Sequence, residues 1–115
     1  MDKGLGLKIQ ATGEGFLVTK PLPPHSKNHH MYYFYVLQSL KDKNLYFGYS
    51  DDLRIRFKEH KGGRVPSTKN RRPLELVYYE AYGSEKDARE RERQIKKRAK
   101  AYISLKRRIT NCLLK

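Results

Sequence analysis

Residues 33–60 decide the fold, and they read YFYVLQSLKDKNLYFGYSDDLRIRFKEH. The aromatic and β-branched run 32–38 and the similar run 45–49 predict two strands, and the polar segment 39–44 predicts the hairpin turn between them. The Ser-Asp-Asp sequence at 50–52 supplies side chains that cap a helix, which we expect over 52–61. Gly62 and Gly63 then end that helix.

The rest of the chain adds one strand and two helices to this unit. Residues 74–81 predict the third strand, Ser84 with Asp87 predicts the start of a helix over 85–98, and a last helix is expected over 101–108. We therefore expect an α/β fold of the α+β kind, in which helices flank a three-stranded antiparallel sheet. Residues 1–30 hold none of the nine tyrosines and are rich in Gly and Pro, so we expect a loosely ordered N-terminal leader or linker before a domain over 31–115.

The charge of the chain points to a polyanionic partner. The formal net charge is +14, and residues 31–115 hold 22 of the 26 Lys and Arg but only 10 acidic residues. A folded domain with such an excess typically binds nucleic acid, although a soluble surface with a basic bias is the simpler alternative.

Cysteine and hydropathy exclude several protein classes. Cys112 is the single cysteine, so an intramolecular disulfide is impossible. No apolar run approaches the roughly 20 residues that cross a bilayer, and no secretory signal precedes the domain. The histidines at 25, 29 and 30 match no structural zinc spacing. We expect a cytoplasmic protein without membrane contact.

The two predicted strands bring candidate catalytic tyrosines together. Alternation places Tyr35 on one face of the first strand, and Tyr46 shares a face with Gly48 on the second. Tyr35 and Tyr46 are therefore expected to face one site across the hairpin, where Gly48 leaves space for a helix or a phosphate. The alternative is structural, because tyrosines suit half-buried strands.

The helix after the hairpin carries Arg56 and His60, four residues apart. Arg56 lies at the edge of the apolar stripe, where a guanidinium can grip a phosphate through two hydrogen bonds. His60 lies on the same side and is suited to position water or touch a phosphate oxygen; the alternative is a histidine packed at a helix end.

Glu92 is the candidate metal ligand. It falls on a stripe of the long helix with Ala88, Ile95, Ala99 and Tyr102. A carboxylate that faces the interior is costly unless it is paired or binds a metal, and Mg²⁺ accepts one carboxylate together with waters and a phosphate. The competing interpretation is a structural salt bridge, with Arg56 as the candidate partner.

These motifs, in this order, resemble the GIY-YIG nuclease superfamily, and especially its small single-domain bacterial members. Tyr33-Phe34-Tyr35 resembles the first family motif and Tyr46-Phe47-Gly48 the second, and Arg56 with His60 resembles the helix motif. Glu92, followed by Ile95-Lys96, resembles the metal-binding glutamate. The first motif departs from the family at Tyr33, which replaces a glycine.

The resemblance implies hydrolysis of phosphodiester bonds with a single Mg²⁺ or Mn²⁺. Tyr46 or Tyr35 would accept a proton from the attacking water, Arg56 would stabilise charge on the phosphate, and Glu92 would hold the metal. The expected protein is a metal-dependent endonuclease that acts on DNA with structure selectivity or weak sequence preference. The alternative is a nucleic-acid-binding module of the same fold with little or no catalysis.

Basic residues outside this cluster are expected to neutralise phosphates without reading bases; a solvated basic face is the simpler alternative. The candidates are Lys69, Arg71 and Arg72 before the third strand and Lys96 and Lys97 at the end of the long helix.

Overall fold

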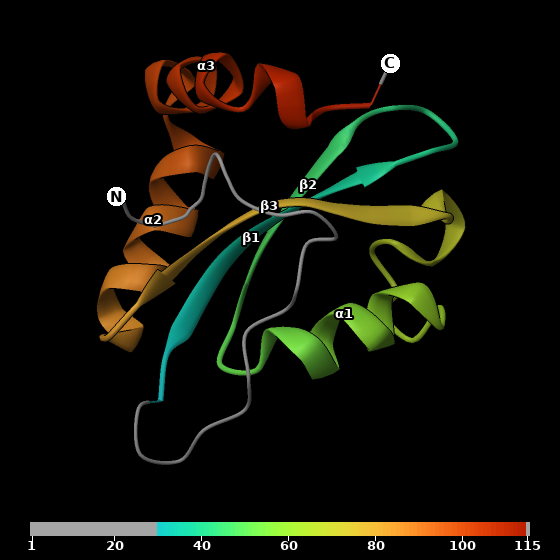
Figure 1. The fold of residues 1–115 in the computed structure, drawn as a ribbon, viewed down its shortest axis with the longest axis horizontal. Helices are drawn as coiled ribbons and strands as arrows, with labels where there is room; N and C mark the ends of the chain where they lie inside the picture. The colour runs from blue at the N-terminus through green and yellow to red at the C-terminus, as the bar shows by residue number, and fades with distance from the viewer. Residues whose placement is uncertain (1–29, 115) are drawn as a thin grey trace.

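The structure, a computed structural model, describes residues 30–114 (Figure 1). Its elements along the chain are β1 (Tyr32–Ser39), β2 (Leu45–Ser50), α1 (Leu53–Lys61), the 3₁₀ helix η1 (Lys69–Arg71), β3 (Leu74–Tyr82), α2 (Glu85–Lys97), α3 (Ala99–Arg108) and η2 (Thr110–Cys112). The predicted strands and helices are confirmed, with bounds that differ by one or two residues. The prediction of a loosely ordered leader falls on residues that lie outside the described range, apart from residue 30.

The sheet is antiparallel and has the strand order β2-β1-β3. Because β1 is central, its residues from Tyr33 to Ser39 are all buried. The register pairs Tyr35 with Gly48 and Leu37 with Tyr46 across the hairpin. This register brings both motif tyrosines to neighbouring positions on one face of the sheet.

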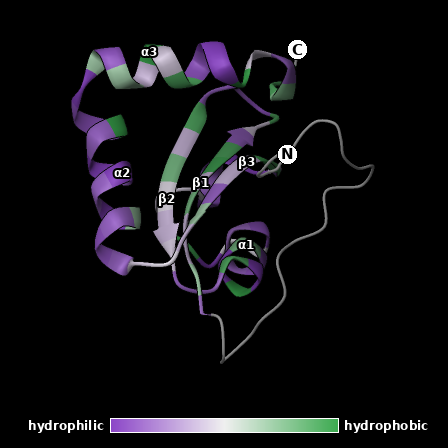
Figure 2. Ribbon diagram, turned by 60° about the vertical axis from the view of Figure 1, so that its left-hand side comes forward, coloured by the Kyte–Doolittle hydropathy of each residue, from purple (hydrophilic) through white to green (hydrophobic). Residues whose placement is uncertain are grey.

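Helices cover both faces of the sheet, with α1 on one face and α2 and α3 on the other (Figure 1). The α1 side buries Tyr33, Tyr35 and Leu37 with Leu53, as the alternation of β1 predicted. The opposite core buries Phe34 and Val36 against Ile95, Leu105 and Ile109. Figure 2 shows hydrophobic segments in the sheet, whereas most of α2 is hydrophilic.

Short side chains start α1 and α2, as the sequence predicted. The Asp52 carboxylate accepts from the backbone N–H of Ile55 at 3.1 Å, and the Ser84 hydroxyl accepts from that of Asp87 at 3.4 Å. After α1 the chain reverses at Gly63, whose φ of 77° suits glycine.

The long helix is shorter than its predicted apolar stripe. The backbone of Arg98 is extended (φ −122°, ψ 115°), so α2 ends there and α3 begins at the next residue. Of the stripe residues, Ala88 and Ile95 are buried, Ala99 is exposed, and Tyr102 belongs to α3. The predicted apolar stripe that includes Glu92 is therefore wrong beyond Ile95. It was extended to Ala99 and Tyr102 as if they continued the same helix, but the chain turns at Arg98.

None of the helices in the described part of the chain is both long and apolar enough to cross a membrane.

Candidate active site

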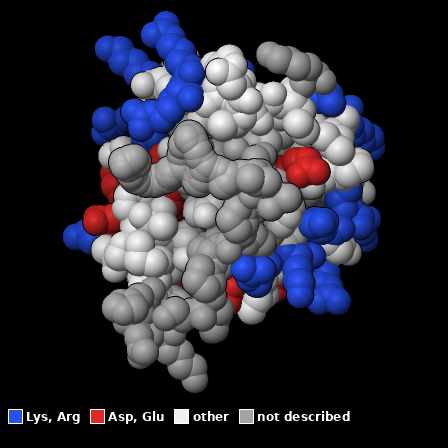
Figure 3. All heavy atoms as spheres, viewed as in Figure 1, with Lys and Arg blue, Asp and Glu red and all other residues white. Residues whose placement is uncertain are grey.

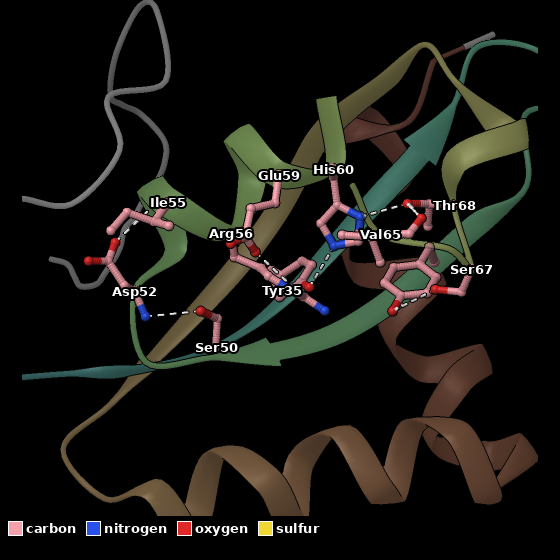
Figure 4. Close-up of polar contacts among 11 residues, drawn as sticks. Tyr35, Ser50, Asp52, Ile55, Arg56, Glu59, His60, Val65, Ser67 and Thr68 are labelled. Carbon is pink, nitrogen blue, oxygen red and sulfur yellow. Dashed lines mark hydrogen bonds and ion pairs between the residues drawn. The ribbon is translucent and has the colours of Figure 1, made fainter. Parts of the chain in front are cut away.

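A chain of buried polar groups joins β1, α1 and the loop after α1 (Figure 4). The Tyr35 hydroxyl lies 2.9 Å from Nε2 of His60, and Nδ1 of the same ring lies 2.8 Å from the hydroxyl of Thr68. All three residues are fully buried, with exposed fractions of 1% for Tyr35 and 0% for His60 and Thr68. His60 therefore lies behind Tyr35, and both of its ring nitrogens are occupied by protein groups.

Burial sets the protonation states of Tyr35 and His60. Desolvation raises the pKa of Tyr35 to about 12, and the charge of Tyr46 and Glu92 adds to this while Arg56 opposes it. Desolvation, with the nearby Arg56, lowers the pKa of His60 to about 4. At neutral pH His60 is therefore an uncharged imidazole, which has one donor and one acceptor nitrogen.

Gly48 makes room for the ring of Tyr35. A Cβ added to Gly48 would lie 2.9 Å from Cε1 of Tyr35 and nearer still to Cζ and the hydroxyl oxygen. The prediction that Gly48 leaves space for a helix or a phosphate is therefore wrong, because the tyrosine across the hairpin fills that space.

Arg56 connects this buried chain to the surface. Its positive charge lies close enough to Tyr35 to oppose the rise in the pKa of that phenol, and its guanidinium forms an ion pair with Glu59 at 2.9 Å. The side chain of Arg56 is 38% exposed, so part of the guanidinium remains accessible to a solution anion. Figure 4 shows Arg56 and Tyr35 side by side beneath α1.

Tyr46 is the more accessible of the two motif tyrosines. Its ring packs edge-on against His60, with ring centroids 5.2 Å apart, while its hydroxyl accepts from the exposed Ser67 at 3.4 Å. The Lys96 ammonium lies 6.0 Å from the centre of the Tyr46 ring. The ring of Tyr46 thus contacts the buried His60, while its hydroxyl lies at the surface beside Ser67.

Glu92 reaches the same region from α2. Its side chain is 24% exposed and pairs with Lys96 at 2.9 Å, one helical turn away, while Arg56 is paired with Glu59 instead. The helix itself is anchored by the adjacent Arg91, which donates twice to Glu80 of β3, at 3.0 and 3.1 Å. Glu92 is thereby held at the edge of the site.

The donor set fits a hard divalent cation held by a single carboxylate. The described residues contain no group of three or more His, Cys, Asp or Glu that could hold a metal, so a multi-ligand protein cage is absent from this part of the chain. Mg²⁺ is usually held by one or two carboxylates plus waters and substrate phosphates. The Glu92 carboxylate, partly exposed and opposed by only one lysine, offers that kind of ligand.

The predicted phosphate-binding residues divide into two kinds. Lys69 and Lys97 are exposed, and Figure 3 shows blue Lys and Arg side chains at several places around the molecule. Arg71 donates to the carbonyl of Leu45 at 3.4 Å and faces Asp42, whereas Arg72 donates to the carbonyls of Lys69 and Lys61. The two arginines thus have structural partners that hold the loop against the hairpin and α1.

Thr68 and Ser67 were not predicted as site residues. They lie in the loop between α1 and β3, where the sequence analysis singled out only the basic residues. No local pattern marks a threonine eight positions after His60 as the hydrogen-bond partner of that histidine. Two hydroxyl residues beside Pro66 were the one available signal, and it is common to many turns.

Comparison with known proteins agrees with this geometry. Residues 31–108 match the GIY-YIG catalytic domain. The chain is 40% identical over 68 residues to the UPF0213 protein of Bacillus pumilus, covering 58% of this chain and 68% of that protein. It is 41% identical over 71 residues to the UPF0213 protein of Pediococcus pentosaceus, covering 61% of this chain and 74% of the relative. The UPF0213 protein YazA of Bacillus subtilis is 38% identical over 81 residues, covering 66% of this chain and 81% of its own.

No solved structure matches the chain. The matched residues contain all five residues of the tyrosine, arginine, histidine and glutamate cluster. The chain belongs to the GIY-YIG nuclease superfamily and is similar to its small bacterial members.

Proposed function

We propose that this protein is a metal-dependent endonuclease that hydrolyses phosphodiester bonds in DNA, with structure selectivity or weak sequence preference. The observation that carries the proposal is that one place in the fold brings together Tyr35, Tyr46, Arg56, His60 and Glu92, from β1, β2, α1 and α2, with Tyr35 and His60 buried and the others partly exposed. Family membership supports a nuclease-type activity, and the geometry suggests a role for each residue.

Tyr46 is the proposed general base. Its hydroxyl is at the surface, where a water molecule can reach it, whereas Tyr35 is buried and burial raises its pKa to about 12. Acting in its phenolate form, Tyr46 takes a proton from the attacking water and becomes a neutral phenol as the water oxygen bonds to phosphorus. The bond from phosphorus to the leaving oxygen then breaks, and that oxygen takes a proton from solvent.

Arg56 is the proposed phosphate ligand. Part of its guanidinium is exposed, and its ion pair with Glu59 at 2.9 Å fixes the direction in which the remaining N–H groups point. Charge-assisted hydrogen bonds from a fixed guanidinium stabilise the negative charge that grows on the phosphate in the transition state.

Glu92 is the proposed ligand of Mg²⁺ or Mn²⁺. When bound, the cation supplies a Lewis acid that stabilises charge on the phosphate and leaving oxygens. The residue's own contribution is a carboxylate held beside Tyr46 by α2, whose ion pair with Lys96 must open to admit a cation.

DNA is the proposed substrate because the charge of the domain is strongly positive. The net charge of +14 favours a nucleic acid over a small phosphodiester, and exposed lysines such as Lys69 and Lys97 can contact phosphates of any sequence.

A nicking assay tests the proposal. Branched and linear DNA are incubated with the protein in Mg²⁺, in Mn²⁺ and in a chelator, and the same series is repeated with Tyr46→Phe and with Tyr49→Phe. Tyr49 lies on the same strand, and its hydroxyl bonds to Glu85 at 2.6 Å, so its variant is a matched control. We expect cation-dependent cleavage that Tyr46→Phe abolishes and Tyr49→Phe retains. DNA binding without cleavage under all conditions would instead identify a binding module.

A further inference from the structure

The direction of each hydrogen bond in the buried chain can be worked out from its ends. At one end, the Thr68 hydroxyl donates its proton to the carbonyl of Val65, so its oxygen accepts from Nδ1 of His60. At the other end, the buried Tyr35 O–H needs an acceptor of its own. Among the residues that the structure describes, the acceptor within hydrogen-bond distance of this hydroxyl is Nε2 of His60, at 2.9 Å.

This direction determines the tautomer of His60. An uncharged imidazole that accepts at Nε2 carries its proton on Nδ1. Nδ1 lies 2.8 Å from the Thr68 hydroxyl oxygen, which therefore accepts this proton's hydrogen bond. The Thr68 hydroxyl in turn donates to the carbonyl of Val65 at 3.5 Å. The hydrogen bonds thus run in one sense, from Tyr35 through His60 and Thr68 to Val65.

The reverse tautomer is poorly satisfied in this environment. With the proton on Nε2, His60 would donate to the Tyr35 oxygen, and the Tyr35 O–H would lose its acceptor. Tyr35 is 1% exposed, so water does not readily replace the lost partner. The Thr68 oxygen is the group that makes the Nδ1–H tautomer favourable.

We propose that Thr68 is a positioning residue of this site: it fixes the Nδ1–H tautomer of His60, which keeps Tyr35 turned as a hydrogen-bond donor to His60. Thr68 has no contact with substrate in this role and acts only through His60 and Tyr35. The consequence for catalysis rests on the proposed nuclease function, whereas the tautomer does not.

The tautomer is measured by ¹⁵N NMR of histidine-labelled protein at neutral pH. A spectrum of His60→Gln identifies the His60 signals by their disappearance. We expect Nδ1 of His60 to resonate as a protonated nitrogen and Nε2 as an unprotonated one. In Thr68→Val, which removes the oxygen and keeps the shape, we expect the Nε2–H tautomer to gain population, and Thr68→Ser should restore the parent spectrum.

Cleavage kinetics supply the second measurement. Partners that orient a functional group typically contribute about 10- to 100-fold, so we expect kcat of Thr68→Val to fall by roughly that factor with KM changed little, and Thr68→Ser to recover most of it. Thr110→Val is the matched control, because the Thr110 hydroxyl bonds only to carbonyls at the end of α3, at 3.0 Å.

Two results would overturn the proposal: a proton on Nε2 of His60 in the parent protein, or an unchanged tautomer and kcat in Thr68→Val. The parent spectrum needs no substituted protein, so it decides the tautomer even if Thr68→Val does not fold. If the parent protein shows no cleavage, the proposed nuclease function fails while the NMR measurement still decides the role of Thr68.

Discussion

Replacing Gly48 by alanine tests the close contact between the two motif strands. An added Cβ would overlap the phenol ring of Tyr35, which is fully buried and cannot move outward without leaving His60. If the ring were elsewhere, alanine in a strand would stabilise the protein by about 0.5–1 kcal/mol relative to glycine. The two arrangements therefore predict opposite signs for the change in the free energy of unfolding.

The expected loss has two parts. Overpacking of a buried site costs about 1–3 kcal/mol. Displacing the ring weakens the 2.9 Å bond from Tyr35 to His60, and a buried polar group left without a partner costs a further 1–3 kcal/mol or so. After subtracting the gain in strand propensity, we expect Gly48→Ala to lose about 3 kcal/mol. At roughly 4–8 °C per kcal/mol for a small domain, a loss of about 3 kcal/mol should lower the Tm by roughly 12–24 °C.

Thermal and urea denaturation measure this loss against two controls. Gly83→Ala adds a methyl group where no other atom lies within 4 Å, so we expect its stability to change by less than about 0.5 kcal/mol. Tyr35→Phe removes the hydroxyl without adding volume and isolates the hydrogen-bond part of the loss. A Gly48→Ala protein as stable as its parent, or more stable, would refute the packing described for Tyr35.

Three further predictions concern charge. Glu92→Gln should keep a free energy of unfolding within about 0.5 kcal/mol of the parent, because the ion pair that it loses lies within one helix and is partly exposed, yet it should lose cation-dependent cleavage; marked destabilisation would show a structural acid. Lys69→Glu and Lys97→Glu should weaken binding to unrelated duplexes alike and reduce the slope of log K against log salt by about 0.9 per lost phosphate contact; a loss confined to one sequence would indicate base reading. Because the pKa of His60 falls from 6.5 to about 4 on folding, the unfolded chain binds more protons between these values. The contribution of His60 to the free energy of unfolding should be fully present above pH 6.5. It should fall as the pH is lowered toward 4, at up to about 1.4 kcal/mol per pH unit, and His60→Gln should remove this dependence.

The fold could be predicted because its signals are local. The alternation of β1 assigned Tyr35 and Phe34 to opposite cores, and both assignments are confirmed. Asp52 and Ser84 marked helix starts through side chains that bond within three residues. The end of α2 was predicted to within one residue, but neither Gly nor Pro interrupts the apolar stripe there, so no local signal removed Ala99 and Tyr102 from it.

The site was predictable in its residue types but less so in its contacts. Gly48 was expected to admit a ligand, and only the hairpin register shows that it admits Tyr35. Glu92 was weighed against a pair with Arg56, yet each finds a partner on its own helix. Arg71 and Arg72 were selected for charge, and their structural contacts with distant carbonyls depend on the path of a loop. Such contacts between segments far apart in the sequence leave no periodic pattern.

The residues of the site are divided between the two sides of the sheet, and this division has a consequence for dynamics. Tyr35, Arg56 and His60 belong to the α1 layer, whereas Glu92 moves with α2, which the Arg91 pair with Glu80 fastens to β3. Transient opening of α2 and α3 alone would carry the carboxylate away while the tyrosine and histidine stayed paired. Native-state hydrogen exchange can resolve such partial opening. Under the proposed function, opening of the α2 layer would remove the cation ligand Glu92 while the contact between Tyr35 and His60 remains intact.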